Sequence, residues 1–236
     1  NGGSNQAIVE KNVIELAKTV KLKIRATVTA FSVDKMVDSV KWLAERGVKR
    51  IHFGPVTPGG RGATNDPRLQ PPKAEDFIKN LHDSIILGEK LGVDVICFPY
   101  MNAMYAPMTY CDGRINKRLV ITPKGIVSSC VEVQDKNHPL FDAFNLGHYN
   151  PTDKKFVLTA TERKSAQKKG CEALKQNKAQ CKACPLLFFC GGGCPTRNYR
   201  GSGNTEQIDD YRCQIIKGIM PFVLRRFYDA AYPKKK

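Results

Sequence analysis

The sequence predicts an α/β protein in which parallel β-α-β units are followed by a cysteine-rich, basic region. Three observations lead to this expectation. Segments rich in β-branched residues alternate with segments of helical periodicity through the first part of the chain. Of the nine cysteines, only Cys97 falls within the first 110 residues. Of the net charge of +16, the residues from 151 onward supply +11, with 18 Lys or Arg against 7 Asp or Glu. We therefore expect two regions, 1–104 and 105–236.

The elements of the first region follow one another at the spacing of β-α-β units. In chain order they are a helix at 5–19, strand 21–29, helix 33–46, strand 48–56, helix 73–91 and strand 93–98. Ser32 is a candidate N-cap for the second helix. His52 and His82 stand alone in their segments, and we expect them to be packing or surface residues.

The strand at 21–29 separates its side chains into two faces. Ile24, Ala26 and Val28 would lie on one face, and Arg25, Thr27 and Thr29 on the other. In α/β barrels, polar side chains near the carboxyl end of a strand contact ligands. A solvated strand face is an equally weighted interpretation.

Three parallel strands do not close a barrel, and an open sheet of this size leaves its edges and one face poorly covered. The chain also begins on the Gly-rich NGGSNQ and a helix rather than on a strand. We therefore expect that strands preceding residue 1 are absent from this chain or are supplied by another chain.

The second region carries a cysteine array of regular spacing. Cys181 and Cys184 form a CxxC, Cys190 follows after five residues, and Gly-Gly-Gly separates it from Cys194. Upstream, residues 118–129 (RLVITPKGIVSS) predict a hairpin with a Pro-Lys-Gly turn, which would bring Cys111 and Cys130 together. Cys213 lies at the start of a C-terminal helical segment.

Three chemistries use cysteines in such numbers. Disulfides are disfavoured, because the count is odd and the N-terminus is no signal peptide. Structural zinc and iron–sulfur clusters both take Cys₄ ligand sets, and a CxxC does not separate them. No apolar run approaches the roughly 18–20 residues that span a bilayer. We therefore expect a cytoplasmic protein without a membrane partner.

The complete array resembles a known family. The pattern C-x13-G-x4-C, C-x2-C-x5-C-x3-C and a distant C is similar at every spacing to the seven-cysteine SPASM motif of radical SAM enzymes. FFCGGGCP resembles the central loop of that motif, and FNLGHY at 144–149 resembles the segment after its hairpin. Residues 1–104 resemble the second half of the radical SAM partial barrel, with RATVT as its fourth strand. The resemblance implies half of a barrel followed by a small, irregular α+β SPASM domain.

The resemblance also implies the ligands of two auxiliary [4Fe-4S] clusters. Four cysteines are expected to hold the outer cluster: Cys181, Cys184, Cys190 and Cys213. Three others are expected to serve the inner cluster: Cys111, Cys130 and Cys194. Cys171, Cys97 or an open iron that binds a substrate group would complete the inner site. Arg25, with Thr27 on the same strand face, resembles the family's contact to S-adenosylmethionine.

Members of this family mostly modify peptides or proteins. Their first cluster, held by a CxxxCxxC, cleaves S-adenosylmethionine, and this sequence contains no CxxxCxxC. We therefore expect the C-terminal portion of such an enzyme, inactive alone, with its catalytic residues unknown. The expected partners are the absent N-terminal half of the barrel, a peptide or protein substrate, and an electron donor of the flavodoxin or ferredoxin type.

A different class of function stays open beside the enzyme. The alternative is a non-catalytic metal-binding module, either a zinc-filled scaffold or an iron–sulfur electron-transfer protein. Nucleic acid is a poor candidate despite the positive charge, because the basic residues lack an aromatic-interleaved strand or a recognised binding module.

Overall fold

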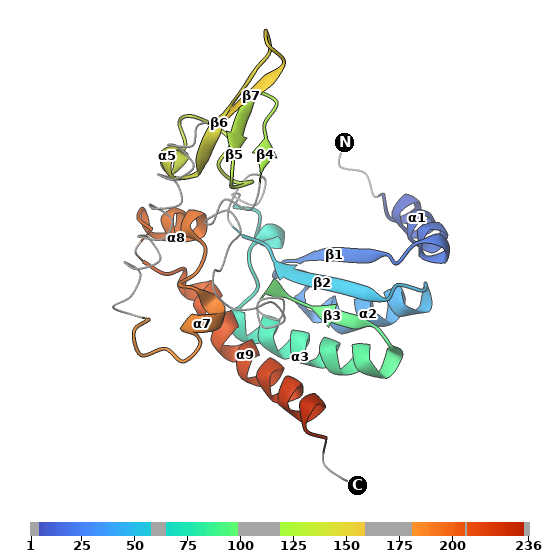
Figure 1. The fold of residues 1–236 in the computed structure, drawn as a ribbon. Helices are drawn as coiled ribbons and strands as arrows, with labels where there is room; N and C mark the ends of the chain where they lie inside the picture. Colours follow the sequence, from blue (N-terminus) through green and yellow to red (C-terminus); the bar gives the residue numbers. More distant parts are fainter. Residues whose placement is uncertain (1–4, 58–64, 99–118, 159–180, 206, 234–236) are drawn as a thin grey trace. The chain divides into compact units, whose positions relative to one another are not determined.

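The computed structural model describes residues 5–57, 65–98, 119–158, 181–205 and 207–233, and the chain divides into two compact units (Figure 1). Unit 1 comprises Asn1–Met104 and Gln214–Lys236, and unit 2 comprises Tyr105–Cys213. The first boundary coincides with the expected one. The C-terminal segment differs from the expectation, because it clusters with unit 1 rather than with the cysteine-rich region.

Unit 1 is a parallel sheet with helices, which confirms the α/β class. Its elements are α1 (Gln6–Thr19), β1 (Lys23–Val28), η1 (Val33–Lys35), α2 (Met36–Glu45), β2 (Arg50–Pro55), η3 (Pro67–Leu69), α3 (Ala74–Leu91), β3 (Asp94–Ile96) and most of α9 (Asp210–Ala231). The strand order is β1-β2-β3, and both pairs run parallel.

Strand alternation and helical periodicity together build the core of unit 1. Val28, Ile51 and Phe53 are almost completely buried and share one face of the sheet, because side chains alternate along a strand. Helices α2 and α3 pack against each other on one side of the sheet (Figure 1). They bury Val40 and Phe77 there. The opposite sheet face carries the polar residues of β1 and β2.

The start of the second helical segment differs from the expected one. Val33–Lys35 form a 3₁₀ turn before α2 begins at Met36. The Ser32 hydroxyl makes no capping hydrogen bond to this turn. It accepts a hydrogen bond from the backbone N–H of Thr29 at 3.0 Å instead. Ser32 therefore closes the loop after β1 rather than capping a helix, which is the competing use of a serine hydroxyl near a turn.

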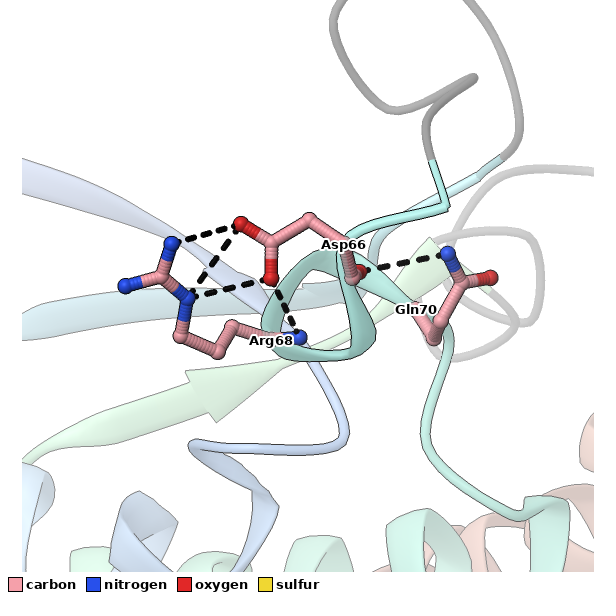
Figure 2. A network of polar contacts seen from close by, with 3 residues as sticks. All are labelled: Asp66, Arg68 and Gln70. Atoms are coloured by element: carbon pink, nitrogen blue, oxygen red, sulfur yellow. Dashed lines mark hydrogen bonds and ion pairs between the residues drawn. The ribbon is translucent and has the colours of Figure 1, made fainter.

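A polar network fixes the loop between β2 and α3 (Figure 2). Asp66 Oδ1 accepts hydrogen bonds from the backbone N–H and from Nε of Arg68, both at 3.0 Å. These bonds to Arg68 hold the pKa of Asp66 at about 2. Gln70 Nε2 donates to the Asp66 carbonyl at 3.3 Å, and the Gln70 carbonyl accepts the N–H of Ala30 at 2.8 Å. The network thereby ties this loop to the chain that leaves β1.

The C-terminal helix α9 packs along α3 within unit 1. The His82 and Phe222 rings lie 4.2 Å apart between centroids, and Arg226 forms an ion pair with Glu89. The apolar face of α9 is buried at five positions: Ile215, Ile216, Ile219, Met220 and Val223. This apolar face explains why the end of the chain joins unit 1.

Unit 2 contains a small antiparallel sheet and short helices. Its elements are β4 (Val120–Ile121), β5 (Ile126–Ser128), α5 (Phe141–Phe144), β6 (Asn145–Asn150), β7 (Lys155–Leu158), α7 (Leu187–Cys190) and α8 (Pro195–Ser202). The strand order is β4-β5-β6-β7. The predicted hairpin is confirmed as β4 and β5, closed by a hydrogen bond from the Gly125 N–H to the Thr122 carbonyl at 2.9 Å.

None of the helices in the described ranges has the length and the apolar composition to cross a membrane.

Candidate metal centre

The CxxC forms a tight turn in unit 2. The Cys184 N–H donates to the Cys181 carbonyl at 2.9 Å. Cys181 is buried, and Cys184 is half-buried. The turn therefore directs one sulfur into the unit and leaves the other closer to its surface. Two cysteines of one turn are a frequent source of ligands for one metal centre.

A glycine loop wraps around the third cysteine of the array. Helix α7 ends at Cys190, and Gly191, Gly192 and Gly193 follow with φ of +60°, +76° and +82°. Three successive residues in this left-handed region require glycine, because a Cβ would clash with the backbone. In this conformation the Gly193 N–H donates to the Cys190 carbonyl at 3.3 Å, and the Gly192 and Gly193 N–H groups lower the pKa of the Cys190 thiol. Hydrogen bonds to cysteine sulfur are a determinant of iron–sulfur reduction potentials.

Burial and two other cysteines raise the pKa of the Cys190 thiol. Burial raises the pKa of Cys190 to about 11, and repulsion from nearby Cys213 and Cys181 adds to the rise, while the two glycine N–H groups oppose it. These three cysteines belong to the four expected at the outer cluster. The structure therefore brings them close enough to interact. A thiol with a raised pKa is protonated at neutral pH until a metal displaces the proton.

Cys194 lies at the start of helix α8. Its carbonyl accepts hydrogen bonds from the backbone N–H groups of Arg197 at 3.1 Å and Asn198 at 2.8 Å. Its sulfur lies 3.1 Å from Thr196 Oγ1, and Thr196 is buried. Cys194 is thus held by the first turn of α8, with a hydroxyl beside its sulfur.

Cys130 follows the hairpin, where hydrogen bonds to Ser128 and packing in an apolar cluster hold it in place. Its N–H donates to Ser128 Oγ, and its carbonyl accepts from the same hydroxyl, both at 3.1 Å. Cys130 is 9% exposed and packs with Val133 and Phe144 in an apolar cluster. This packing gives the sulfur low-dielectric surroundings, which modulate the potential of a bound cluster.

Two of the predicted ligands, Cys111 and Cys171, lie outside the described residues. Cys97 is buried just beyond β3 in unit 1. The seven cysteines in the described ranges form no disulfide with one another. The pairing of Cys111 with Cys130 and the fourth ligand of the inner site therefore stay predictions.

Within the described ranges, no three His, Cys, Asp or Glu side chains are close enough to hold a single metal ion. A tetrahedral zinc site needs sulfurs about 3.8 Å apart, since each Zn–S bond is about 2.3 Å long. A [4Fe-4S] cluster binds each thiolate to a different iron, so its four sulfurs lie farther apart. Among the cysteines expected at the outer cluster, Cys181 is buried, while Cys184, Cys190 and Cys213 are half-buried.

Arg25 and Thr27 lie on the exposed face of β1, as the alternation predicts. Arg25 is the register partner of His52 on β2, and its guanidinium lies 3.9 Å from the place where a Cβ on Gly54 would stand. Burial, followed by the charges of Arg25 and Lys23, lowers the pKa of His52 to about 4. This face therefore presents cations beside a neutral imidazole.

Two further residues beside the cysteines were not found from the sequence. Asn198 is 1% exposed and hydrogen-bonds on both sides of its carboxamide. Glu132 forms ion pairs with Arg197 and Arg200. Neither residue belongs to a motif. The one feature of the sequence that points to them is their position, Asn198 shortly after Cys194 and Glu132 shortly after Cys130. No protein-family model matches the chain.

Proposed function

We propose that this chain is the C-terminal portion of a radical SAM/SPASM enzyme that modifies a peptide or protein, with two auxiliary [4Fe-4S] clusters in unit 2. The observation that carries the proposal is the spacing of the cysteine array, which is similar at every interval to the SPASM motif. The influence of Cys213 and Cys181 on the pKa of the Cys190 thiol, beside the glycine loop, supports it.

In this proposal, unit 1 contributes half of the barrel and unit 2 contributes the cluster domain. Arg25 and Thr27 would face the S-adenosylmethionine side of the barrel, where a guanidinium pairs with a carboxylate. The segment that holds the S-adenosylmethionine-cleaving cluster would come from an N-terminal half, together with its CxxxCxxC. The intact enzyme would work in the cytoplasm, where thiols stay reduced.

The auxiliary clusters would supply one-electron chemistry, either accepting an electron from the substrate or anchoring it. The residues of this chain would hold and insulate them. The Gly192 and Gly193 N–H groups would stabilise negative charge on the Cys190 sulfur, and the apolar cluster around Cys130 would exclude water. The net charge of +16 would attract an acidic electron donor such as a flavodoxin or ferredoxin, or an acidic peptide segment.

The test is iron and acid-labile sulfide analysis of protein prepared and reconstituted without oxygen. Two clusters predict about eight irons and about eight sulfides per chain. About two zincs with no sulfide would instead identify a zinc scaffold and refute the proposal. Reconstitution with iron in the presence of zinc makes the comparison direct.

A ligand variant with a matched control sharpens this test. Cys184→Ala should lower the iron content by between about one and about four atoms per chain, since it removes one cluster ligand. Ala183→Ser changes the exposed neighbour inside the same CxxC and should leave the iron content unchanged. Full iron in Cys184→Ala would refute the ligand set.

A further inference from the structure

We propose that Asn198 is the positioning residue that holds the segment carrying Cys213 against the loop carrying Cys190. Asn198 lies on α8 and is 1% exposed. Its Nδ2 donates to the Gly192 carbonyl at 3.1 Å, and its Oδ1 accepts the N–H of Asp209 at 3.1 Å. One carboxamide thus joins two backbone segments, the glycine loop and the chain that leads into α9.

Each of these segments places a cysteine. Gly192 stands two residues after Cys190 in the glycine loop, and its N–H lowers the pKa of the Cys190 thiol, so fixing Gly192 fixes the backbone beside that thiol. On the other side, the Asp209 carbonyl accepts the N–H of Cys213 at 2.9 Å. Hydrogen bonds of 2.9–3.1 Å therefore join the glycine loop, through Asn198, to the backbone of Cys213.

The chemistry of the position calls for asparagine. The site needs one donor and one acceptor in a single planar group, and it is fully enclosed. Aspartate keeps the acceptor but sets a carboxylate oxygen against the Gly192 carbonyl, and leucine provides neither group. A Cβ on Gly193 would lie only 3.0 Å from Asn198 Oδ1. The loop therefore packs directly on the carboxamide, and a buried N–H and carbonyl lose their partners if it is removed.

The first experiment measures the proximity of Cys190 and Cys213 in iron-free protein, so it does not depend on the proposed function. A short bis-maleimide is added, and the peptide that links these two cysteines is quantified by fragmentation mass spectrometry. We expect the linked peptide in the unmutated protein. Its yield should fall about tenfold in Asn198→Leu, which loses both hydrogen bonds of the carboxamide. It should fall by a smaller factor in Asn198→Asp, which loses only the bond to the Gly192 carbonyl.

Asn204→Ala is the matched control. Asn204 lies in the exposed loop after α8, and its Oδ1 accepts one backbone N–H, from Gln207 at 2.9 Å. This variant should keep the yield of the unmutated protein. An unchanged yield in Asn198→Leu, with a native circular dichroism spectrum, would overturn the proposal. If Asn198→Leu does not fold, the Asn198→Asp yield decides the question, and equality with the unmutated protein overturns the proposal in the same way.

The second experiment rests on the proposed function and measures the spectrum of the outer cluster. After anaerobic reconstitution and one-electron reduction with dithionite, Asn198→Asp should change the low-temperature electron paramagnetic resonance spectrum of the outer cluster, because the Cys213 ligand is displaced. Asn204→Ala should give the spectrum of the unmutated protein. A spectrum unchanged in Asn198→Asp contradicts the positioning role. If the unmutated protein binds no iron, the proposed function fails, and the cross-linking result still decides the role of Asn198.

Discussion

Glu132 Oε1 lies 3.5 Å from Arg197 Nη2, and this ion pair joins the loop after Cys130 to helix α8, which follows Cys194. The side chains are 26% and 19% exposed, so both are shielded from water. Glu132 also faces a second cation, since its Oε2 lies 3.2 Å from Arg200 Nη2. The carboxylate therefore links two segments that each carry a proposed ligand of the inner cluster.

Glu132→Gln is expected to weaken this link. It leaves two neighbouring guanidinium groups without their shared carboxylate, and removing one partner of a shielded ion pair costs about 1–3 kcal/mol. Thermal unfolding followed by circular dichroism measures the loss. Asp135→Asn is the matched control, because Asp135 pairs with Lys124 on the exposed surface of the same unit. If Glu132→Gln is as stable as this control, the ion pairs of Glu132 contribute no more stability than an exposed ion pair does.

Acidification is predicted to destabilise unit 1 through His52. Burial and the charges of Arg25 and Lys23 lower the pKa of His52 to about 4 in the folded protein, while an unfolded histidine titrates near 6.5. Between these values the unfolded chain binds more protons, so stability falls as the pH decreases from about 6.5 to about 4. His52→Gln should lose less stability across this window. Urea unfolding followed by Trp42 fluorescence measures the difference, and equal losses would contradict the prediction.

The pKa of His52 itself can be tested with a charge variant. Arg25→Ala should raise this pKa only part of the way to its usual value, because burial is the larger cause. The imidazole carbon-bound protons, followed by NMR through the titration, report it directly. Arg50→Ala is the control, since Arg50 pairs with Asp94 at 2.7 Å and is not among the causes of the shift. If Arg25→Ala and Arg50→Ala change the pKa of His52 equally, Arg25 has no specific role in lowering it.

Features that depend on neighbouring residues could be predicted from the sequence. Contacts between residues far apart in the chain could not. The two faces of β1 and the turn at Gly125 follow from alternation and turn chemistry, which operate within a few residues. Ser32 was assigned as a helix cap, but its hydroxyl bonds to Thr29, because a serine before a turn has two competing partners.

The same distinction between local patterns and distant contacts applies to the candidate site. Which thiols share a cluster is implied by the resemblance of the cysteine array to the SPASM motif, and it stays a prediction. The role of Asn198 depends on its contact with Asp209, eleven residues along the chain. No periodicity encodes such a contact, so only the folded arrangement of the loops reveals it. The sequence predicts a helical segment at the C-terminus, but it does not predict that this segment joins unit 1.

Gly88→Ala is expected to destabilise unit 1. A methyl group on Gly88 would stand 2.6 Å from the Val93 carbonyl oxygen and 2.6 Å from Val95 Cγ2. The neighbouring backbone is held by the Val93 N–H, which donates to the Gly88 carbonyl at 2.7 Å. Overpacking costs about 1–3 kcal/mol, which exceeds the roughly 0.8–1.0 kcal/mol that alanine gains in a helix. Urea unfolding followed by Trp42 fluorescence should show the net loss.

Gly201→Ala is the matched control for this substitution. Gly201 lies on α8, and a methyl group there would meet no atom within 4 Å. Helix propensity alone then acts, so the stability should stay equal or rise by up to about 1 kcal/mol. Because Gly201 belongs to unit 2, circular dichroism is used for this variant. A loss of stability in both variants would show that packing around Gly88 is not the cause.

Helix α1 is predicted to depend on Arg46 for its attachment to unit 1. The Arg46 guanidinium stacks over Trp42 at 3.9 Å from the ring centroid, and its Nε donates to Glu10 Oε1 of α1 at 2.9 Å. Only Val13 of α1 is buried, so little apolar packing supplements this contact. Arg46→Ala should lower the free energy of local opening of α1 by about 1–3 kcal/mol. Hydrogen exchange of the α1 amides should accelerate by a corresponding factor, with β2 unaffected.

The control for Arg46→Ala removes another ion pair of the same helix. Lys18 pairs with Glu15 at 3.1 Å, and both side chains are 62% exposed. Exposed pairs at this spacing contribute little, so Lys18→Ala should change the exchange of α1 by less than about threefold. If the two variants exchange alike, α1 is held by Val13 alone. If Arg46→Ala accelerates exchange in β2 as well, Arg46 supports the sheet rather than the attachment of α1.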